Sequence, residues 1–357
     1  MRHPVIDWAD PTLALLHGGP GGWALVAGLP IGQADAVPVS SPDAQAWAPV
    51  DGAVIVQHDY EGASWTSAIG AKMPAPAAPD LVIPRLAAPL EPAWSAEVHQ
   101  AKVRDIQARI GRGDCYQVNL AVPFTGRLAA GDDAALFAAL LRASPAPFAA
   151  FIRRPGQPTV ISHSPENLVA WSGSSAVSSP IKGTRRREPG REDEIRADLV
   201  ASAKDRAELA MIVDLARNDL GRVSVPGSVR VAAAARLMDL PYVHHLVADV
   251  VATLRPGTTV EDLMTALFPA GSITGAPKKM AMQVIAALEG RPRGAYCGAF
   301  GWRTADAGQL AVAIRTALVD GDRVTLWAGS GITADSDPVA EWDEVRAKAD
   351  GMARVIT

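Results

Sequence analysis

The sequence predicts a folded α/β protein in which strands and helices alternate. Three observations support this class. The 357 residues are 48% hydrophobic and 20% charged, a balance typical of globular proteins and not of disordered chains. Short strand-like segments separated by turns fill residues 1–70. From residue 95 to the end, period-2 and period-3.6 apolar patterns follow one another.

Residues 1–94 are predicted to form a strand-rich region that ends in an extended connector. Trp23–Val26 and Val54–Val56 have the apolar character of strands, and glycines punctuate the segments around them. Residues 71–94 hold six prolines among alanines, a composition that excludes a helix or a central strand. Residues 95–357 are expected to form one continuous structural unit.

The first helix is predicted to start at Ser95, a good capping residue, and to stop near Gly111. Val98, Ile106 and Ile110 would form its apolar face.

A later helix is predicted from Ser202, which can cap it, to Leu220, with Gly221 as a left-handed stop. Asp205 and Glu208 lie three residues apart, so both carboxylates point to one side of this helix. These carboxylates could bind a cation, or they could simply pair with arginines of the same helix.

The last helix is predicted to follow Asp337–Pro338 and to run to about Val355. Glu341 and Glu344 again lie three residues apart on it. Two carboxylate pairs on two helices could meet around one hard divalent cation, and Mg²⁺ suits a few carboxylates, waters and an anionic substrate group. The alternative is an ordinary surface pair between Glu344 and Lys348.

Three segments offer groups that could bind carboxylates. The glycine loop Gly271–Lys278 leads into a helix that Glu289–Gly290 closes, with Pro277 expected at the first helical position, and such helix ends attract anions. The loop lacks the spacing of a phosphate-binding P-loop. Ala328–Gly331 follows a strand and could offer amides in the same way. Arg315 interrupts an apolar strand, so its guanidinium needs a carboxylate from the protein or from a ligand.

Lys182 lies in the segment Pro180–Thr184, between an apolar run and a basic cluster. A lysine amine becomes a nucleophile when its surroundings lower its pKa from the usual value of about 10.4. Desolvation, a bound Mg²⁺ or the adjacent arginines Arg185–Arg187 could lower it. The alternative is a surface lysine, which is what most lysines are.

Composition limits the kinds of binding partner and the cellular location that can be expected. The net charge of −4 provides no basic surface for nucleic acid. No apolar run reaches the ~18 residues of a membrane span, and the first residues lack an apolar signal core, so a cytoplasmic location is expected. Cys115 and Cys297 are too few for a disulfide framework or a zinc site.

Together, several ordered segments resemble the chorismate-utilising enzymes over roughly residues 95–357. The segments are Gly113–Leu120, Ser164–Glu166, Pro180–Thr184, Glu208–Arg222, Val243–Val247, Gly271–Lys278, Tyr296–Gly298, Ile314–Thr316 and Ala334–Glu341. Each is weak alone, but their number and order carry the resemblance. It implies an α/β (α+β) fold of large, mostly antiparallel sheets packed in layers with outer helices, and residues 95–357 as the chorismate-binding catalytic region.

Within this family, the residue at position 182 separates the reactions. Lysine in Pro-Ile-Lys-Gly-Thr resembles component I of aminodeoxychorismate synthase, which serves para-aminobenzoate and folate synthesis, whereas anthranilate synthases usually carry alanine there. Isochorismate and salicylate synthases usually carry a lysine base where this chain has Gln117. The resemblance therefore implies amination of chorismate at C4.

The resemblance also implies roles for the site residues. The residues expected to hold Mg²⁺ against the ring carboxylate are Glu208 and Glu344, with Glu341 and Asp205 nearby. The groups expected to bind the other carboxylate are Arg315, Tyr296 and the amides of Gly329 and Gly331. The residues expected to line the site are Thr274, His245 and Gln117.

In the implied reaction, Glu166 protonates the departing C4 hydroxyl while Lys182 attacks C2, and ammonia then displaces the lysine by attacking C4. Neither Cys115 nor Cys297 lies in the strand-to-helix elbow of a glutaminase nucleophile. Ammonia is therefore expected from solution or from a separate glutamine amidotransferase subunit. With no lyase segment in the chain, para-aminobenzoate would need another enzyme.

Three alternatives remain beside this interpretation. Anthranilate synthase component I is the nearest, and Lys182 argues against it. The segment His17–Pro20 is similar to an oxyanion loop of α/β-hydrolases, but the chain lacks their G-x-S-x-G elbow. A catalytically inactive homologue that only binds a dicarboxylate is the non-enzyme alternative, and the intact Glu166, Lys182, Glu208 and Glu344 argue against that.

Overall fold

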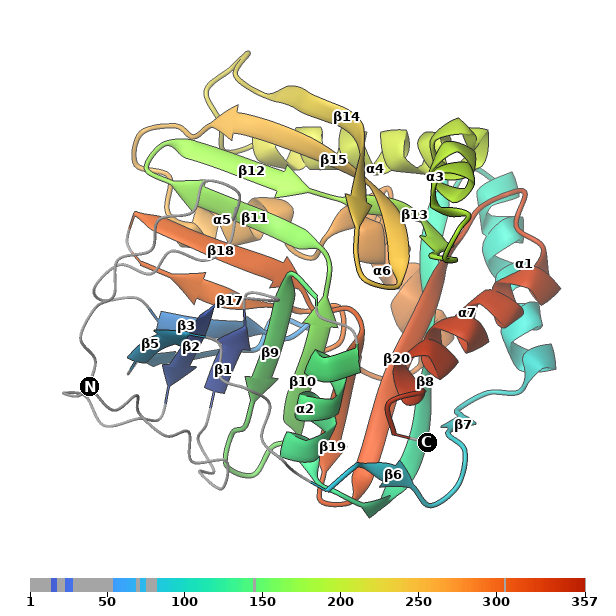
Figure 1. Cartoon of the computed structure of the whole chain (residues 1–357). Coiled ribbons are helices and arrows are strands. Elements are labelled where there is room, and N and C mark those ends of the chain that lie inside the picture. Colours follow the sequence, from blue (N-terminus) through green and yellow to red (C-terminus); the bar gives the residue numbers. More distant parts are fainter. Residues whose placement is uncertain are drawn as a thin grey trace.

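The structure is a computed structural model that describes residues 14–17, 23–27, 54–68, 71–74, 82–143, 146–304 and 306–356. Within these residues the chain forms two large sheets, and every strand pairing in them is antiparallel. Helices lie on the outside of both sheets (Figure 1). The predicted α/β fold of layered antiparallel sheets is confirmed.

The larger sheet has 11 strands, and near one edge β8 and β20 pair along most of their length. In spatial order its strands are β16 (Gly275–Ala276), β8 (Gln117–Ala130), β20 (Arg323–Ile332), β19 (Thr316–Asp320), β10 (Thr159–Ser164), β9 (Phe148–Ile152), β1 (Ala14–His17), β2 (Trp23–Ala27) and β5 (Ala71–Pro74), with β6 (Arg85–Leu86) and β7 (Glu91–Pro92) beside β8.

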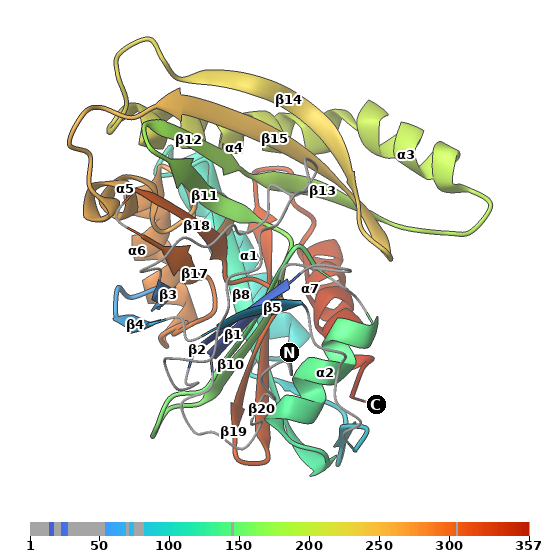
Figure 2. The ribbon, with the colours of Figure 1, turned by 60° about the vertical axis from the view of Figure 1, so that its left-hand side comes forward.

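The smaller sheet has nine strands and curves over the larger one (Figure 2). In spatial order its strands are β13 (Ile181–Arg186), β15 (Val243–Thr253), β12 (Ser175–Ser179), β11 (Asn167–Ser172), β18 (Ala307–Val312), β17 (Ala299–Arg303), β3 (Val54–His58) and β4 (Ser64–Ala68), with β14 (Arg230–Asp239) beside β15.

Seven α-helices and one short 3₁₀-helix connect the strands of the described residues. They are α1 (Ala96–Gly111), α2 (Asp133–Ala143), α3 (Glu192–Ala201), α4 (Ala203–Gly221), α5 (Val260–Leu267), the 3₁₀-helix η1 (Gly271–Ile273), α6 (Lys278–Glu289) and α7 (Pro338–Ala353). In Figure 1, α1 and α7 flank β8 and β20, α2 lies against β9 and β10, and α4 lies behind the smaller sheet. None of these helices combines the length and the apolarity that a membrane crossing needs.

The two sheets pack face to face through an apolar core. Leu16 and Ile152 of the larger sheet belong to the same buried cluster as Ile55 and Phe300 of the smaller one. All four side chains are at most 1% exposed, and burying each stabilises the fold by about 1.5–3 kcal/mol. The N-terminal strands therefore contribute to both sheets: β1, β2 and β5 to the larger, β3 and β4 to the smaller.

The chain passes between the sheets several times; one crossing from the larger to the smaller lies between β10 and β11, and one from the smaller to the larger lies between β18 and β19. The two crossings lie side by side. The backbone N–H of Val312 donates to the carbonyl of Glu166 at 3.0 Å, and that of His163 donates to the carbonyl of Arg315 at 3.0 Å. Antiparallel pairing thus places Glu166 and Arg315 together at the junction of the sheets.

The predicted α1 is present, but its buried face differs from the prediction. The Ser95 side chain caps the helix by accepting from the N–H of Val98. Val98 itself is 44% exposed, and the buried positions are His99, Val103 and Ile106. The helix packs against α7 with a histidine ring in contact with Trp342, which an apolar pattern does not reveal.

The predicted acidic helices are also present, with one end corrected. The Ser202 side chain caps α4 by accepting from the N–H of Asp205 at 3.2 Å. Gly221 is the last helical residue and not a left-handed stop, since the right-handed Arg222 closes the helix. Asp337 caps α7 with its side chain.

The glycine loop differs from its prediction. Gly271–Ile273 forms η1, and Gly275–Ala276 pairs with β8, so the segment is regular structure and not an open loop. Pro277 lies just before α6 and not at its first position, while Gly290 ends the helix in a left-handed conformation, φ 65°, as expected.

Candidate active site

Lys182 occupies an irregular point in the pairing of β13 with β15. The register shifts between Lys182 and Thr184, so that the intervening Gly183, φ 76°, is an extra residue. A Cβ atom at Gly183 would lie 3.0 Å from the side chains of Leu199 and Asp205. Glycine is therefore required after Lys182, and the bulge explains why the Lys-Gly-Thr segment is built this way.

The Lys182 side chain is only 14% exposed. Its Nζ lies 3.8 Å from a carboxylate oxygen of Glu208. Burial lowers the pKa of Lys182 most strongly, and the Lys348 cation lowers it further, against the opposing influence of the Glu208 and Glu166 carboxylates. Burial favours the neutral amine because a charged ammonium is costly to remove from water.

The arginines that follow Lys182 do not supply this effect, although the sequence suggested that they could. Arg185 binds Asp198 at 2.7 Å and Asp205 at 3.0 Å. Arg187 binds Glu192 at 3.1 Å. Their charges are neutralised by carboxylates of α3 and α4, which no local sequence pattern indicated.

Glu166 lies in the first crossing between the sheets and is 4% exposed. The Ser272 hydroxyl donates to its Oε1 at 2.5 Å. Burial raises the pKa of Glu166 to about 7, even though the Ser272 hydrogen bond and the Lys182 cation hold it down. A carboxyl group that is protonated near neutral pH can act as a general acid.

Arg315 lies in the second crossing, with an unusual positive φ of 51°. No carboxylate of the described residues pairs with it, and its guanidinium donates to Nε2 of His245 at 2.9 Å. Because Nε2 accepts, Nδ1 of His245 carries the hydrogen and donates to the Thr184 hydroxyl at 2.9 Å. Burial lowers the pKa of Arg315 to about 10, and burial with the Arg315 charge lowers that of His245 to about 3. The result is a guanidinium beside a neutral imidazole.

Gln117 and Gly331 line the space around the Lys182 amine. A Cβ atom at Gly331 would lie 3.0 Å from the amide nitrogen of Gln117 and 3.1 Å from Nζ of Lys182. Gln117 is fully buried, and neither its Oε1 nor its Nε2 has a hydrogen-bond partner among the described residues. Buried amides are normally satisfied, so these atoms indicate room for a polar ligand.

Beyond Leu326, β19 no longer pairs with β20, which leaves that edge of β20 without a strand partner among the described residues. The backbone groups of Gly329 point to this unpaired edge and not to β8, since its carbonyl accepts from Nζ of Lys348 at 2.9 Å. The residue opposite in β8, Ala121, directs its N–H to Glu289 instead of to β20. Gly331 lies two residues on and has the same orientation, so both amides face away from β8.

Two further predicted site residues, Tyr296 and Thr274, are buried within the fold. Tyr296 is 4% exposed and its ring stacks on Trp327, with 5.4 Å between centroids and 12° between planes. Thr274 is fully buried, and its hydroxyl donates to the carbonyl of Ala270 at 2.8 Å. The hydroxyl of Thr274 is therefore already hydrogen-bonded within the protein.

The acidic helices α4 and α7 bring Glu208 and Glu344 into electrostatic contact. Burial raises the pKa of Glu208, the Lys182 and Lys204 cations oppose it, and the Glu344 carboxylate raises it further. At Glu344 burial acts in the same sense, but Lys348 at 2.7 Å outweighs it and lowers the pKa. A cation would relieve the repulsion between these two carboxylates.

The other two predicted metal residues are engaged by the protein. The carboxylate of Asp205 pairs with Arg185 at 3.0 Å. Glu341 is 5% exposed; its Oε1 accepts from the Ser336 hydroxyl at 2.7 Å, while its Oε2 has no partner. Across the described ranges, no three metal-binding side chains gather into one cluster. The residues that fit a cation best are thus Glu208 and Glu344, and the unpartnered Oε2 of Glu341 is a further acceptor.

Two residues have contacts that the sequence did not indicate. Ser272 lies inside the glycine loop, but nothing in its spacing relates it to Glu166. Lys348 forms the expected i, i+4 pair with Glu344, and its Nζ also reaches the carbonyl of Gly329. Its position four residues after Glu344 was the signal that could have placed it at the site.

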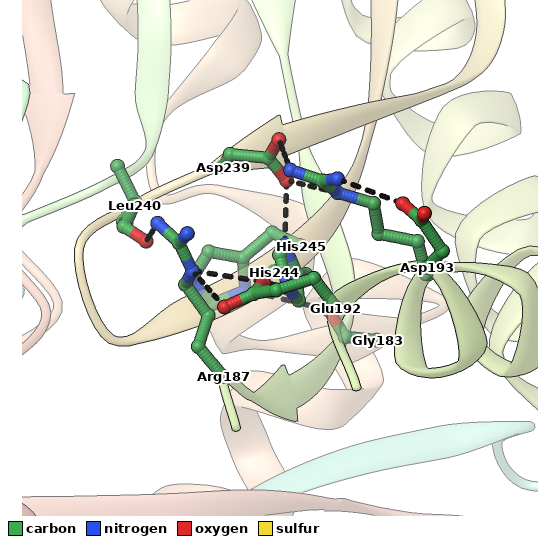
Figure 3. Close-up of polar contacts among 9 residues, drawn as sticks. Gly183, Arg187, Glu192, Asp193, Asp239, Leu240, His244 and His245 are labelled. Atoms are coloured by element: carbon green, nitrogen blue, oxygen red, sulfur yellow. Dashed lines mark hydrogen bonds and ion pairs between the residues drawn. The ribbon is translucent and has the colours of Figure 1, made fainter. Parts of the chain in front are cut away.

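A second polar cluster lies next to His245 on β15 (Figure 3). His244 is fully buried, and its two ring nitrogens lie 2.5 Å from Asp239 and 2.8 Å from Glu192. Carboxylate oxygens only accept, so both nitrogens donate and the ring is an imidazolium. Arg187 binds the same Glu192 and the carbonyl of Leu240. This cluster ties α3 to β13, β14 and β15.

Comparisons with known proteins place the chain in a family. The family model of the chorismate binding enzymes matches residues 56–354. An anthranilate synthase component 1 from Haloferax volcanii is 41% identical over 272 residues, which cover 73% of this chain and 51% of that protein. An aminodeoxychorismate synthase component 1 from Klebsiella aerogenes is 44% identical over 263 residues, covering 71% and 58%. The chain thus spans little more than half the length of these relatives.

Solved structures agree on the fold. The menaquinone-specific isochorismate synthase of Escherichia coli superimposes with a TM-score of 0.80 at 18% identity, covering 99% of this chain and 92% of that one. Component I of anthranilate synthase from Streptococcus pneumoniae does so with a TM-score of 0.74 at 24% identity, covering 99% and 95%. The chain belongs to the chorismate-binding enzymes.

Proposed function

We propose that the protein is component I of an aminodeoxychorismate synthase, which aminates chorismate at C4 through a covalent adduct on Lys182. The observation that carries this proposal is the buried Lys182 amine with a lowered pKa, in the electrostatic field of Glu166, a carboxyl group whose pKa is raised to about 7. A neutral amine and a protonated carboxyl are the two states that this chemistry requires.

Similarity alone does not choose between the two reactions. Relatives named for aminodeoxychorismate synthase and for anthranilate synthase match this chain at nearly equal identity, 44% and 41%. The nucleophile makes the difference, because a direct attack of ammonia at C2 needs no lysine in the cleft. Lys182 therefore favours amination at C4, with anthranilate synthase as the alternative.

Chorismate carries two carboxylates, and the cleft offers two sets of groups for them. Arg315, without a carboxylate of its own, would bind one together with Tyr296 and the amides of Gly329 and Gly331. Glu208 and Glu344, with Glu341 and Asp205 nearby, would hold Mg²⁺, which when bound neutralises the other carboxylate and fixes the ring. Gln117, Thr274 and His245 would shape the space between them.

In the first step the Lys182 nitrogen forms a bond to C2 of chorismate. Both ring double bonds shift, C1=C2 to C1=C6 and C5=C6 to C4=C5, the C4–oxygen bond breaks, and Glu166 delivers its proton so that the oxygen leaves as water. The nitrogen then loses a proton and remains as a neutral secondary amine. Burial of Lys182 serves this step by favouring the unprotonated nucleophile.

In the second step ammonia attacks C4 and both ring double bonds shift back. The C2–nitrogen bond breaks, and the lysine leaves as it takes up a proton. The product is 4-amino-4-deoxychorismate, with the hydroxyl of the substrate replaced by an amine. Ammonia enters and water leaves, so the reaction consumes no oxidant or reductant.

We propose that a glutamine amidotransferase subunit supplies the ammonia. Cys115 and Cys297 are both buried, and burial raises the pKa of each thiol, so neither is a reactive thiolate. The isolated chain is expected to aminate chorismate with ammonium salts but not with glutamine. Glutamine-dependent turnover by this chain alone would contradict the partner assignment.

The test is to incubate the protein with chorismate, Mg²⁺ and ammonium and to identify the product. We expect aminodeoxychorismate, and we expect turnover to stop after exhaustive chelation and to return with added Mg²⁺. Anthranilate and pyruvate as products would replace this proposal with the alternative. Full activity after chelation would remove Mg²⁺ from it.

A further inference from the structure

Ser272 is held rigidly against Glu166 by groups that do not face the substrate. It lies in η1, is 6% exposed, and donates from its hydroxyl to Oε1 of Glu166 at 2.5 Å. The next residue, Ile273, is fixed through its carbonyl, which accepts from Arg293 at 2.8 Å. The hydroxyl of Ser272 therefore has a fixed place before any substrate arrives.

The anchor of η1 is a buried ion pair. Arg293 is 1% exposed and binds Glu289 through two hydrogen bonds of 2.9 Å and 2.6 Å. Its guanidinium also donates to the carbonyl of Asn119 in β8, and Glu289 accepts from the N–H of Ala121. The pair thus fastens η1 to β8 of the larger sheet.

We propose that Ser272 is a positioning residue for Glu166. By donating to Oε1, Ser272 assigns the acidic proton of Glu166 to Oε2 and directs that oxygen to the leaving group of the substrate. This inference rests on the general-acid role of Glu166 in the proposed function. The geometry carries it: in a protonated carboxyl the carbonyl oxygen is the stronger acceptor, so the Ser272 donor on Oε1 favours Oε2 as the protonated atom.

The same hydrogen bond also acts on the acidity of Glu166. A donor to a carboxylate stabilises the ionised form, and the Ser272 bond lowers the pKa that burial has raised. Three other groups face this carboxyl: the Lys182 cation and the N–H of Ile181, which lower its pKa, and the buried thiol of Cys297. Removing the hydroxyl leaves these groups in place and should raise the pKa of Glu166.

The test compares Ser272→Ala with Ser272→Thr, which keeps the hydroxyl. The titration of Glu166 is read directly from the infrared band of the protonated carboxyl, assigned by its loss in Glu166→Gln. We expect the midpoint to rise by about one pH unit in Ser272→Ala and to stay near wild type in Ser272→Thr. An unchanged midpoint in Ser272→Ala would overturn the proposal, whatever its effect on rate.

The kinetic readout is the pH profile of chorismate consumption. In Ser272→Ala, kcat should fall roughly 10- to 100-fold while KM changes less than about threefold, and the alkaline limb should move to higher pH. A rise in KM with unchanged kcat would contradict a positioning role. Ser224→Ala is the matched control, because Ser224 is 2% exposed and its hydroxyl donates to the carbonyl of Leu220, away from Glu166.

A further variant and a comparison of titration with turnover complete the test. If Ser272→Ala does not fold, Ser272→Cys keeps the volume with a weak donor and should shift the midpoint in the same direction. The infrared titration needs no turnover, so it separates the two hypotheses. A wild-type protein that makes no aminodeoxychorismate refutes the proposed function, whereas turnover with an unshifted midpoint in the variants refutes only the role of Ser272.

Discussion

Two polar clusters lie on neighbouring residues of β15, and they differ in how their charges are balanced. Around His244 the charges are paired within the protein: two carboxylates face the imidazolium, Arg187 binds Glu192, and Arg196 binds Asp239 at 2.7 Å (Figure 3). Around His245 the charges are not all paired within the protein.

In the proposed substrate site next to His245, Arg315 has no carboxylate partner among the described residues. The side-chain amide of Gln117, which lies with the Lys182 amine against Gly331, is buried without hydrogen bonds to the described residues. Folded proteins satisfy almost all buried polar groups, because each unpaired group costs about 1–3 kcal/mol. A guanidinium without a carboxylate and a buried amide without hydrogen bonds fit the proposed site, because a ligand could supply the missing partners.

This contrast gives a rule for mutations. Changes in the cleft should remove activity with little loss of stability, since the native groups there are not optimised for the fold. Changes in the His244 cluster should remove stability with little loss of activity. A cleft variant that unfolds, or a cluster variant that is stable and inactive, would break the comparison.

The largest effect is expected from Lys182→Met, which keeps the length of the side chain without the amine. Activity with ammonium should fall at least about a thousandfold, because the nucleophile of the covalent step is gone. The melting temperature should stay within about 4 °C of wild type, since no apolar packing is lost. Lys204→Met, on the exposed side of Glu208, is the matched control and should remain folded and active.

Glu166→Gln should reduce kcat roughly 10²- to 10⁴-fold, the usual contribution of a general acid. Its effect on stability depends on pH. The folded-state pKa of Glu166, about 7, lies above its ordinary value of 4.5, so its stabilising contribution is full below pH 4.5 and is lost as pH rises through 7.

Glutamine cannot ionise, so the variant should be more stable than wild type at pH 9, by on the order of 3 kcal/mol, and equal to it near pH 4.5. Urea unfolding at both pH values checks this. Equal stability at pH 9 would mean that Glu166 is not a buried acid.

Arg315→Met should raise the KM for chorismate about 100-fold, because one substrate carboxylate loses its charged partner. Arg315→Lys should recover only part of this, since an ammonium lacks the planar fork that binds a carboxylate with two hydrogen bonds. Steady-state kinetics and a thermal melt test both variants. A large loss of stability with unchanged KM would show that Arg315 serves the fold.

The smallest effect on activity is expected in the satisfied cluster. His244→Gln removes the cation between Glu192 and Asp239, and unfolding should require about 2 kcal/mol less free energy. Activity below the melting transition should change less than about threefold. Chemical denaturation gives the first number and the ammonium assay the second, and a variant that is fully stable but inactive would refute the division.

Part of the proposed site could be predicted from the sequence, because some of its residues lie in short motifs whose chemistry can be read locally. Lys182 and the acidic pairs of α4 and α7 were recognisable in this way, whereas Glu166 was indicated only by the resemblance to the chorismate-utilising enzymes. Helix caps at Ser202 and Asp337 were predictable for the same reason, since capping depends on the nearest three residues.

What the sequence could not indicate depends on pairing between distant segments. The crossings that bring Glu166 beside Arg315 are fixed by strand order. The hydrogen bond from Ser272 to Glu166 joins residues 106 positions apart. Arg185, after Lys182, pairs with Asp198 of α3 and Asp205 of α4.

The most direct test of the central claim is to trap the lysine adduct. The protein is mixed with chorismate and Mg²⁺ without any ammonia, quenched in acid and digested for mass spectrometry. The account predicts one modified peptide, heavier by chorismate less one water, with the modification on Lys182 and absent from Lys182→Met. Formation of aminodeoxychorismate by wild type without such an adduct, or at an undiminished rate by Lys182→Met, would contradict the covalent mechanism.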